Sequence, residues 1–212
     1  MPNWCANELK ISSKNPEMLR DFLSKFLVIK DGLEELSMDN LMPCPKELLT
    51  RNVPEDQNAE FEAESRRLVD LYGSPDWYEW RLSHWGCKWD IGFCNVLHNT
   101  DNEFWAEFNT AWAPPISFFD SIRREYPDLE FALLFEEPGC NFAGIYRVTA
   151  EEETLIESEL ECADENGNIV EYDEAASKWK YSDDGKYIED ESFFPVTRNP
   201  FYDDFTSDEG FT

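Results

Sequence analysis

The chain has 212 residues, enough for one sizeable hydrophobic core and an appendage. Hydrophobic residues make up 42% and aromatic residues 15% of the sequence, which excludes a wholly disordered protein. No apolar run approaches the roughly 18 residues of a membrane-spanning helix. The first residues lack the basic start and apolar stretch of a signal peptide, so we expect a soluble, cytoplasmic protein.

The net charge is −28 and is unevenly distributed. Residues 1–150 hold 26 acidic and 14 basic residues, a net charge of −12, whereas residues 151–212 hold 20 acidic and 4 basic residues, a net charge of −16. Binding to nucleic acid or anionic lipid requires cations that neutralise phosphates. We therefore expect direct contact with neither nucleic acid nor a membrane.

The cysteines are scattered, with no CxxC pair and no nearby histidine set. Thiols in a cytoplasmic chain stay reduced, and small buried thiols pack like other apolar residues. We therefore expect structural cysteines, no metal site and no cofactor. Cys5, beside Trp4, could be a nucleophile, but nothing nearby in the sequence would lower its pKa.

Secondary structure is predicted in chain order from periodicity and breakers. Residues 4–12 alternate as a strand, and Asn15 with Pro16 begins a helix that runs to residue 27. Residues 28–63 lose this periodicity and are interpreted as irregular. The later predictions are helices at 60–72, 76–84 and 114–126, and strands at 88–96, 103–112, 129–135 and 142–149.

The order of these elements predicts an α+β fold of the ferredoxin-like βαββαβ type, followed by one further strand. An irregular and helical insertion occupies about residues 28–75, and the domain as a whole covers residues 1–150. Residues 151–212 form an acidic extension in which Asn166–Gly167 and Asp184–Gly185 predict β-hairpins. Its last 20 residues, from Phe193, could either be flexible or dock their aromatic rings on the sheet.

Four of the eight tryptophans lie within residues 77–89, among charged and polar side chains. Such a density of indoles is typical of a joint in the core, with Gly86 permitting a tight turn, or of the wall of a binding pocket. The sequence contains no Walker loop, dinucleotide fingerprint or Ser/His/Asp order, so no residue is assigned a catalytic role. The candidates for a ligand pocket are Trp80, Arg81, His84, Trp85, Lys88, Trp89, Asp90 and Glu136.

Several sequence blocks occur in a characteristic order: MPNWCAN at residues 1–7, WGCKWD at 85–90, TAWAPP at 110–115 and EEPGCNFAG at 136–144. In these blocks the chain resembles the YubB-like (Api-like) family of proteins carried by phages and conjugative plasmids. The resemblance covers about residues 1–12 and 77–147. It implies a ferredoxin-like domain and residence on a mobile element, and it implies no catalytic residue.

The acidic extension has two possible interpretations. Its carboxylates could simply keep one face solvated, or they could imitate the phosphates of duplex DNA, which carries a charge about every 1.7 Å along its axis. The side chains that would face a basic partner are Glu151, Glu152, Glu153, Glu157, Glu159, Glu161, Asp183, Asp184, Glu189, Asp190 and Glu191.

Composition and resemblance together favour a non-enzymatic accessory protein that binds and inhibits a basic host protein, such as a nuclease, restriction or defence factor. The alternative is a small-molecule-binding or enzymatic domain that uses the Trp-rich segment around residues 80–90. A structural module that self-associates through its sheet or extension is a third possibility. The first hypothesis requires binding that weakens with salt.

Overall fold

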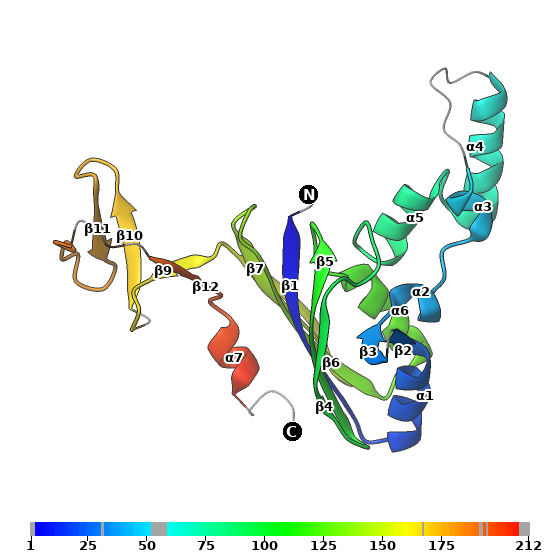
Figure 1. The fold of residues 1–212 in the computed structure, drawn as a ribbon, viewed down its shortest axis with the longest axis horizontal. Helices are drawn as coiled ribbons and strands as arrows, with labels where there is room; N and C mark the ends of the chain where they lie inside the picture. The colour runs from blue at the N-terminus through cyan, green and yellow to red at the C-terminus, as the bar shows by residue number, and fades with distance from the viewer. Residues whose placement is uncertain are drawn as a thin grey trace.

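The computed structural model describes residues 3–30, 32–51, 59–166, 168–190, 193 and 195–207. At its centre is a six-stranded antiparallel sheet in the order β4-β5-β1-β6-β7-β8 (Figure 1). In chain order, the strands are β1 (Trp4–Ser13), β4 (Cys94–Asn99), β5 (Glu103–Ala111), β6 (Leu129–Glu137), β7 (Phe142–Val148) and β8 (Glu153–Ser158).

Two helices, α1 (Pro16–Phe26) and α6 (Ile116–Glu125), cover one face of this sheet. Helix α1 begins as the sequence predicts: the side chain of Asn15 accepts a hydrogen bond from the N–H of Met18, and Pro16 occupies the first turn. The aromatic rings of Phe22 and Phe26 are fully buried against the sheet. Helix α6 follows Pro114 and Pro115, as predicted.

In chain order, β1, α1, β4, β5, α6 and β6 form a βαββαβ unit whose four strands lie in the order β4-β5-β1-β6. This is the ferredoxin-like α+β arrangement that the sequence predicts. Strand β7 adds the further predicted strand beside β6, and β8, which lies beyond residue 150, continues the same sheet.

The segment between α1 and β4 is more ordered than the sequence predicts. It contains a hairpin of β2 (Leu27–Lys30) and β3 (Leu33–Leu36), then the short helices α2 (Met38–Leu41) and α3 (Lys46–Leu49). The longer helices α4 (Ala59–Tyr72) and α5 (Trp77–His84) confirm the two predicted there. Residues 52–58 lie outside the described part of the chain.

The predicted strand at residues 88–96 is wrong over its first six residues. Residues 88–93 form bends and irregular backbone, and the strand starts only at Cys94 and continues to Asn99. Within this stretch, the carboxylate of Asp90 accepts hydrogen bonds from Ser37 and Met38 of the insertion, and such tertiary contacts override local β-propensity.

Beyond β8 the chain forms a second sheet in the order β11-β10-β9-β12, with strands β9 (Glu161–Ala163), β10 (Ile169–Asp173), β11 (Lys178–Tyr181) and β12 (Val196–Arg198). β9 and β10 pair as a hairpin around Asn166, as predicted, although Gly167 lies outside the described residues. Gly185, in the second predicted turn, has a φ of +68°, a conformation that favours glycine.

The two faces of the main sheet differ in their cover. The inner face packs against α1 and α6 and carries the main core, including Leu9, Phe108 and Phe131. The opposite face, which we call the outer face, is partly covered by the short helix α7 (Tyr202–Thr206), whose Phe205 packs on Leu134 and Ile145 (Figure 1). The described part of the C-terminal segment therefore docks on the sheet.

Candidate functional site

The Trp-rich segment, residues 77–90, forms α5 and the turn that follows it. Trp85 is fully buried, and its indole N–H donates a hydrogen bond to the carbonyl of Met42, 3.0 Å away. Trp80 is only 6% exposed and packs edge-on against Trp85, with ring centroids 6.0 Å apart. These two indoles join the insertion to the core, and the ring of Trp85 leaves no surface for a ligand.

The other predicted pocket residues of this segment also make local contacts. The guanidinium of Arg81 lies 4.7 Å from the ring of Trp85, and the ring of His84 stacks on Trp80 at a centroid distance of 4.1 Å. The ammonium of Lys88 lies 5.0 Å from the ring of Trp89. The structure therefore brings these side chains together in pairs along the segment.

Asp90 holds the start of α2. Its Oδ1 accepts a hydrogen bond from the N–H of Met38 at 2.7 Å, and its Oδ2 accepts one from the hydroxyl of Ser37 at 2.8 Å. A carboxylate at a helix N-terminus satisfies donors that have no partner within the helix. Asp90 thus fastens the insertion to the edge of the domain.

Gly86 permits the tight turn after α5, as the interpretation of this segment as a joint in the core predicts. Its φ is +85°, and a Cβ built there would lie 3.1 Å from the carbonyl oxygen of Pro114 and 3.2 Å from the nitrogen of Ile116. Only glycine combines this backbone conformation with such a close approach to the start of α6.

All six cysteines are free thiols, and Cys5, Cys44 and Cys87 are buried. Burial raises the pKa of Cys87 to about 12, with a further increase from the nearby charge of Asp90. Burial also raises the pKa of Cys5 far above the physiological range, with the charge of Glu137 adding to the effect. Neither thiol is ionised near neutral pH, so neither is an activated nucleophile.

Across the described residues, no group of three or more His, Cys, Asp or Glu side chains is placed to hold a metal ion. The helices in that part of the chain also lack the combined length and apolar character that crossing a bilayer requires.

The acidic candidates lie along β8 and the second sheet. All those that the structure describes are exposed except Glu161, which is half-buried, while Glu191 lies outside the described residues. Glu153 pairs with Arg123, and Glu189 pairs with Lys178 at 3.0 Å. Among the described residues, no ion pair is formed by Glu151, Glu152, Glu157, Glu159, Glu161, Asp183 or Asp184.

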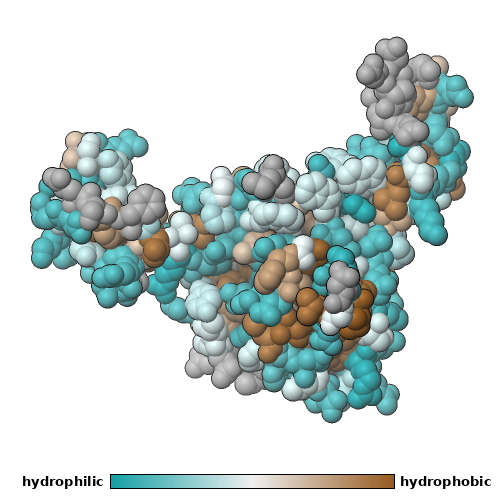
Figure 2. All heavy atoms as spheres, viewed as in Figure 1, coloured by the Kyte–Doolittle hydropathy of each residue, from teal (hydrophilic) through white to brown (hydrophobic). Residues whose placement is uncertain are grey.

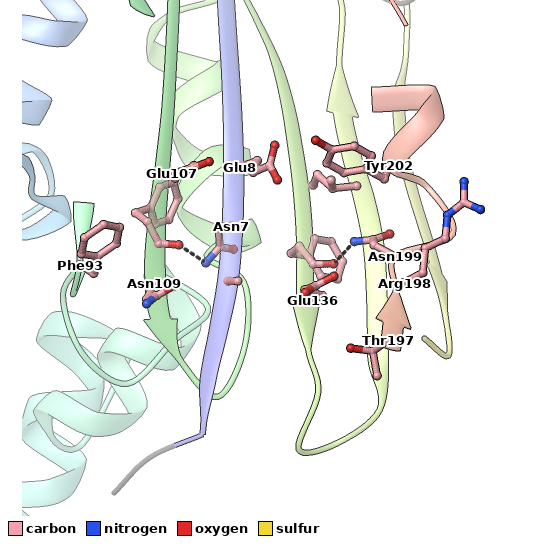
Figure 3. A pocket seen from close by; sticks show the side chains of 14 residues that line it. Asn7, Glu8, Phe93, Glu107, Asn109, Glu136, Thr197, Arg198, Asn199 and Tyr202 are labelled. Carbon is pink, nitrogen blue, oxygen red and sulfur yellow. Dashed lines mark hydrogen bonds between the residues drawn. The ribbon is translucent and has the colours of Figure 1, made fainter. Parts of the chain in front are cut away.

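Glu136 lies apart from the Trp-rich segment, on the outer face of the sheet. There it lines a cavity of about 500 Å³ between the sheet and the C-terminal segment. Figure 3 shows Glu107, Glu8 and Glu136 on three adjacent strands of this cavity, with Phe93 on one side and Tyr202 on the other.

Strand register brings the three carboxylates together. Glu8 of β1 lies directly opposite Glu107 of β5, and Ala6 of β1 lies opposite Glu136 of β6. Glu136 is therefore a diagonal neighbour of Glu8, within the range at which side chains on one sheet face interact. Like charges placed opposite each other destabilise a sheet, which makes this grouping unusual for a purely structural surface.

The surroundings of two of these carboxylates, Glu8 and Glu136, disfavour their ionised forms. Burial raises the pKa of Glu8, and repulsion from Glu107 and Glu136 raises it further, against a smaller opposing effect of Lys10. Burial likewise raises the pKa of Glu136, although a hydrogen bond from Asn199 opposes the shift. Within the described part of the chain, no residue donates a hydrogen bond to the Glu8 carboxylate.

The cations near this cavity are already engaged. The ammonium of Lys10 donates a hydrogen bond to the carbonyl of Phe205 at 2.7 Å and lies 5.0 Å from the ring of Trp105. Arg198 lines the cavity, but its guanidinium pairs with Asp203. The cavity is therefore an acidic site whose carboxylates are poorly neutralised by the protein itself.

The sequence names Glu136 as a candidate for a pocket beside the Trp-rich segment, not for this cavity, and the prediction missed Glu8, Glu107 and Phe93. These residues are far apart in the chain, and the register of β1, β5 and β6 joins the three carboxylates. The alternation of β5 places Glu107 on the face away from the core, which is the signal in the sequence that points toward the site.

The match to a family model agrees with the fold. Residues 88–184 match the family model described as the ferredoxin-like domain in Api92-like protein. No curated protein matches the chain. Among solved structures, the chain is similar to the crystal structure of a protein api92 from Yersinia pseudotuberculosis, with 10% identity and a TM-score of 0.40, over 75% of this chain and 98% of that one. The family match supports a ferredoxin-like domain in the part of the chain that it covers.

Proposed function

We propose that the protein is a non-enzymatic accessory protein of a phage or plasmid, which binds a basic host protein and blocks it in place of nucleic acid. The observation that carries this proposal is the set of exposed carboxylates without ion pairs along β8 and the second sheet. Their mutual repulsion is relieved when a cationic surface covers them. A host nuclease, restriction enzyme or defence factor has such a surface because it binds phosphates.

The proposal is tested by retention of host-extract proteins on the immobilised full chain at low and at moderate salt. A neutralised variant carries Glu151→Gln, Glu152→Gln, Glu157→Gln, Glu159→Gln, Asp183→Asn and Asp184→Asn. A matched control removes the same number of charges from exposed positions of the insertion and helices, with Glu34→Gln, Glu60→Gln, Glu62→Gln, Asp70→Asn, Glu79→Gln and Glu125→Gln.

We expect the native chain and the matched control to retain a basic nucleic-acid-binding protein at about 50 mM salt and to release it at about 300 mM, because screening shortens the range of charge attraction. The neutralised variant should not retain it. Equal retention by all three proteins, or retention that is insensitive to salt, contradicts the proposal.

A further inference from the structure

We infer that the outer face of the main sheet carries a docking groove for an extended basic peptide segment. Its occupant has a lysine or arginine at one position and a large apolar residue two positions away. The inference rests on the proposed function, since the peptide would belong to the basic partner protein. It assigns a specific contact to a groove whose carboxylates, Glu8, Glu107 and Glu136, lie outside the acidic extension.

The groove is formed by two cavities that meet at Glu8. The first, of about 500 Å³, holds Glu8, Glu107 and Glu136 between Phe93 and Tyr202 (Figure 3). The second, of about 290 Å³, is lined by Leu97, Trp105 and Phe205 as well as by Glu8 and Lys10. One cavity is therefore acidic and the other is mainly apolar and aromatic.

Charge complementarity identifies what fits the first cavity. Burial raises the pKa of both Glu8 and Glu136, and repulsion from Glu107 and Glu136 raises the pKa of Glu8 further. A lysine ammonium or arginine guanidinium placed between them would replace this repulsion by attraction and restore ionisation. The exposed ring of Phe93, 62% accessible, offers the same cation an aromatic face.

The apolar cavity identifies the second peptide residue that the groove would hold, the large apolar one. Leu97 is 52% exposed, and Trp105 stands beside it on the outer face. The ammonium of Lys10 is held by the carbonyl of Phe205 and by two aromatic rings, so it marks the end of the acidic cavity. A large apolar side chain in this cavity would bury surface that is otherwise exposed to water.

The spacing between the basic and the apolar residue of the peptide follows from strand β1, which lies beneath both cavities. Glu8 and Lys10 are two residues apart on β1, which corresponds to roughly 6.6 Å along a strand. An extended peptide places the side chains of positions i and i+2 on one side at the same spacing. The groove therefore fits a basic residue and an apolar residue separated by one position.

Figure 2 shows that the surface near β4 and the β2–β3 hairpin is richer in apolar residues than the rest of the visible face. Leu97 of β4 and Ile29 and Leu33 of the hairpin are exposed apolar side chains of these elements.

The test uses the full chain and a labelled, blocked peptide built from Lys-Thr-Leu-Ser repeats, with fluorescence anisotropy as the readout. The groove variant is Glu8→Gln with Glu107→Gln. The control variant, Glu62→Gln with Glu125→Gln, removes two exposed charges outside the groove. Two control peptides replace lysine by glutamate or leucine by serine.

We expect the groove variant to bind the Lys-Thr-Leu-Ser peptide at least about tenfold more weakly than the native chain, while the control variant binds within about twofold of it. The glutamate peptide should not bind, and the serine peptide should bind more weakly. Thermal unfolding verifies that the groove variant folds, and we expect it to be at least as stable as the native chain because two like charges have been removed.

Failure to bind the peptide, or equal binding by native chain and groove variant, overturns the groove. The proposed function would still be supported if the neutralised variant, which lacks carboxylates along β8 and the second sheet, failed to retain the host protein. Conversely, groove-dependent peptide binding together with unchanged retention by the neutralised variant would support the groove and contradict the proposed function.

Discussion

At a few positions, a single residue determines the local geometry through its backbone conformation or its hydrogen bonds. Gly86 permits the turn between α5 and the sheet and lies against the backbone at the start of α6. Asp90 supplies the acceptors for the start of α2. Both roles belong to a segment whose many indoles are typical either of a joint in the core or of the wall of a ligand pocket.

Replacing Gly86 by alanine should destabilise the fold by about 1–3 kcal/mol. The new Cβ would combine a positive φ with a contact of 3.1 Å to the carbonyl of Pro114. Urea unfolding of native and variant chains measures this difference. Gly185→Ala is the informative comparison, since that position has a φ of +68° but open space around it. It should cost less, and an equal cost at both positions would show that the close contact has no effect.

Asp90→Ala should loosen the start of α2 and cost about 1–2 kcal/mol, because the N–H of Met38 and the hydroxyl of Ser37 lose their acceptor. Hydrogen exchange at the amide of Met38 should speed up strongly, while exchange in β1 changes only by the global loss of stability. An unchanged exchange rate at Met38 would contradict the capping role of Asp90.

The carboxylate of Glu8 makes a prediction with a defined pH dependence. Burial and repulsion from Glu107 and Glu136 raise the pKa of Glu8 in the folded state. The ionised carboxylate therefore lowers the free energy of unfolding by its full amount above the folded pKa, and it has no such effect below the unfolded pKa. Glu8→Gln should therefore leave the melting temperature nearly unchanged at about pH 4 and raise it by roughly 1–4 °C at about pH 7. A variant that is less stable than the native chain at neutral pH would contradict this account.

At the scale of elements, the C-terminal helix α7 completes one wall of the outer-face cavities. Phe205 is 4% exposed and packs on Leu134 and Ile145, while Arg147 donates a hydrogen bond to the carbonyl of Asp204 at 2.9 Å. Asn199 fastens the same segment to the carbonyl of Phe135 at 3.0 Å. A short helix of this length has little stability of its own and depends on these contacts.

Phe205→Ala should release α7 from the sheet, because burial of a phenylalanine contributes about 1.5–3 kcal/mol and the helix has few other apolar contacts. Limited proteolysis should then cut the variant within residues 199–207 much faster than the native chain. The cooperative unfolding of the main sheet should shift little, since Phe205 lies outside the main core. Resistance to cleavage equal to that of the native chain would show that Phe205 does not anchor the helix.

The elements that the sequence predicts well are those in which one face is buried along the whole length. The alternation of β5 and the helical spacing of α1 both follow from burial against the same core. The β2–β3 hairpin carries no such pattern, because Ile29 and Leu33 are exposed. The bend at Asp90 depends on its hydrogen bonds with Ser37 and Met38 of the insertion, which no local pattern reveals.

At the scale of the whole molecule, two surfaces gather acidic side chains. The outer-face groove holds three carboxylates gathered by strand register, and the second sheet carries exposed carboxylates that follow directly from the sequence. The composition of the sequence therefore predicts the acidic extension. It does not predict the groove, because Glu8 and Glu107 become neighbours only when β1 pairs with β5.

The measurement that tests the central claim most directly is a competition at low salt, in which duplex DNA is added to host-extract proteins held on the immobilised full chain. A protein that substitutes for nucleic acid shares its binding surface with DNA, so DNA should displace a basic nucleic-acid-binding protein from the native chain. Retention that DNA does not disturb, or failure to retain any basic protein, would contradict the claim that this chain acts by imitating nucleic acid.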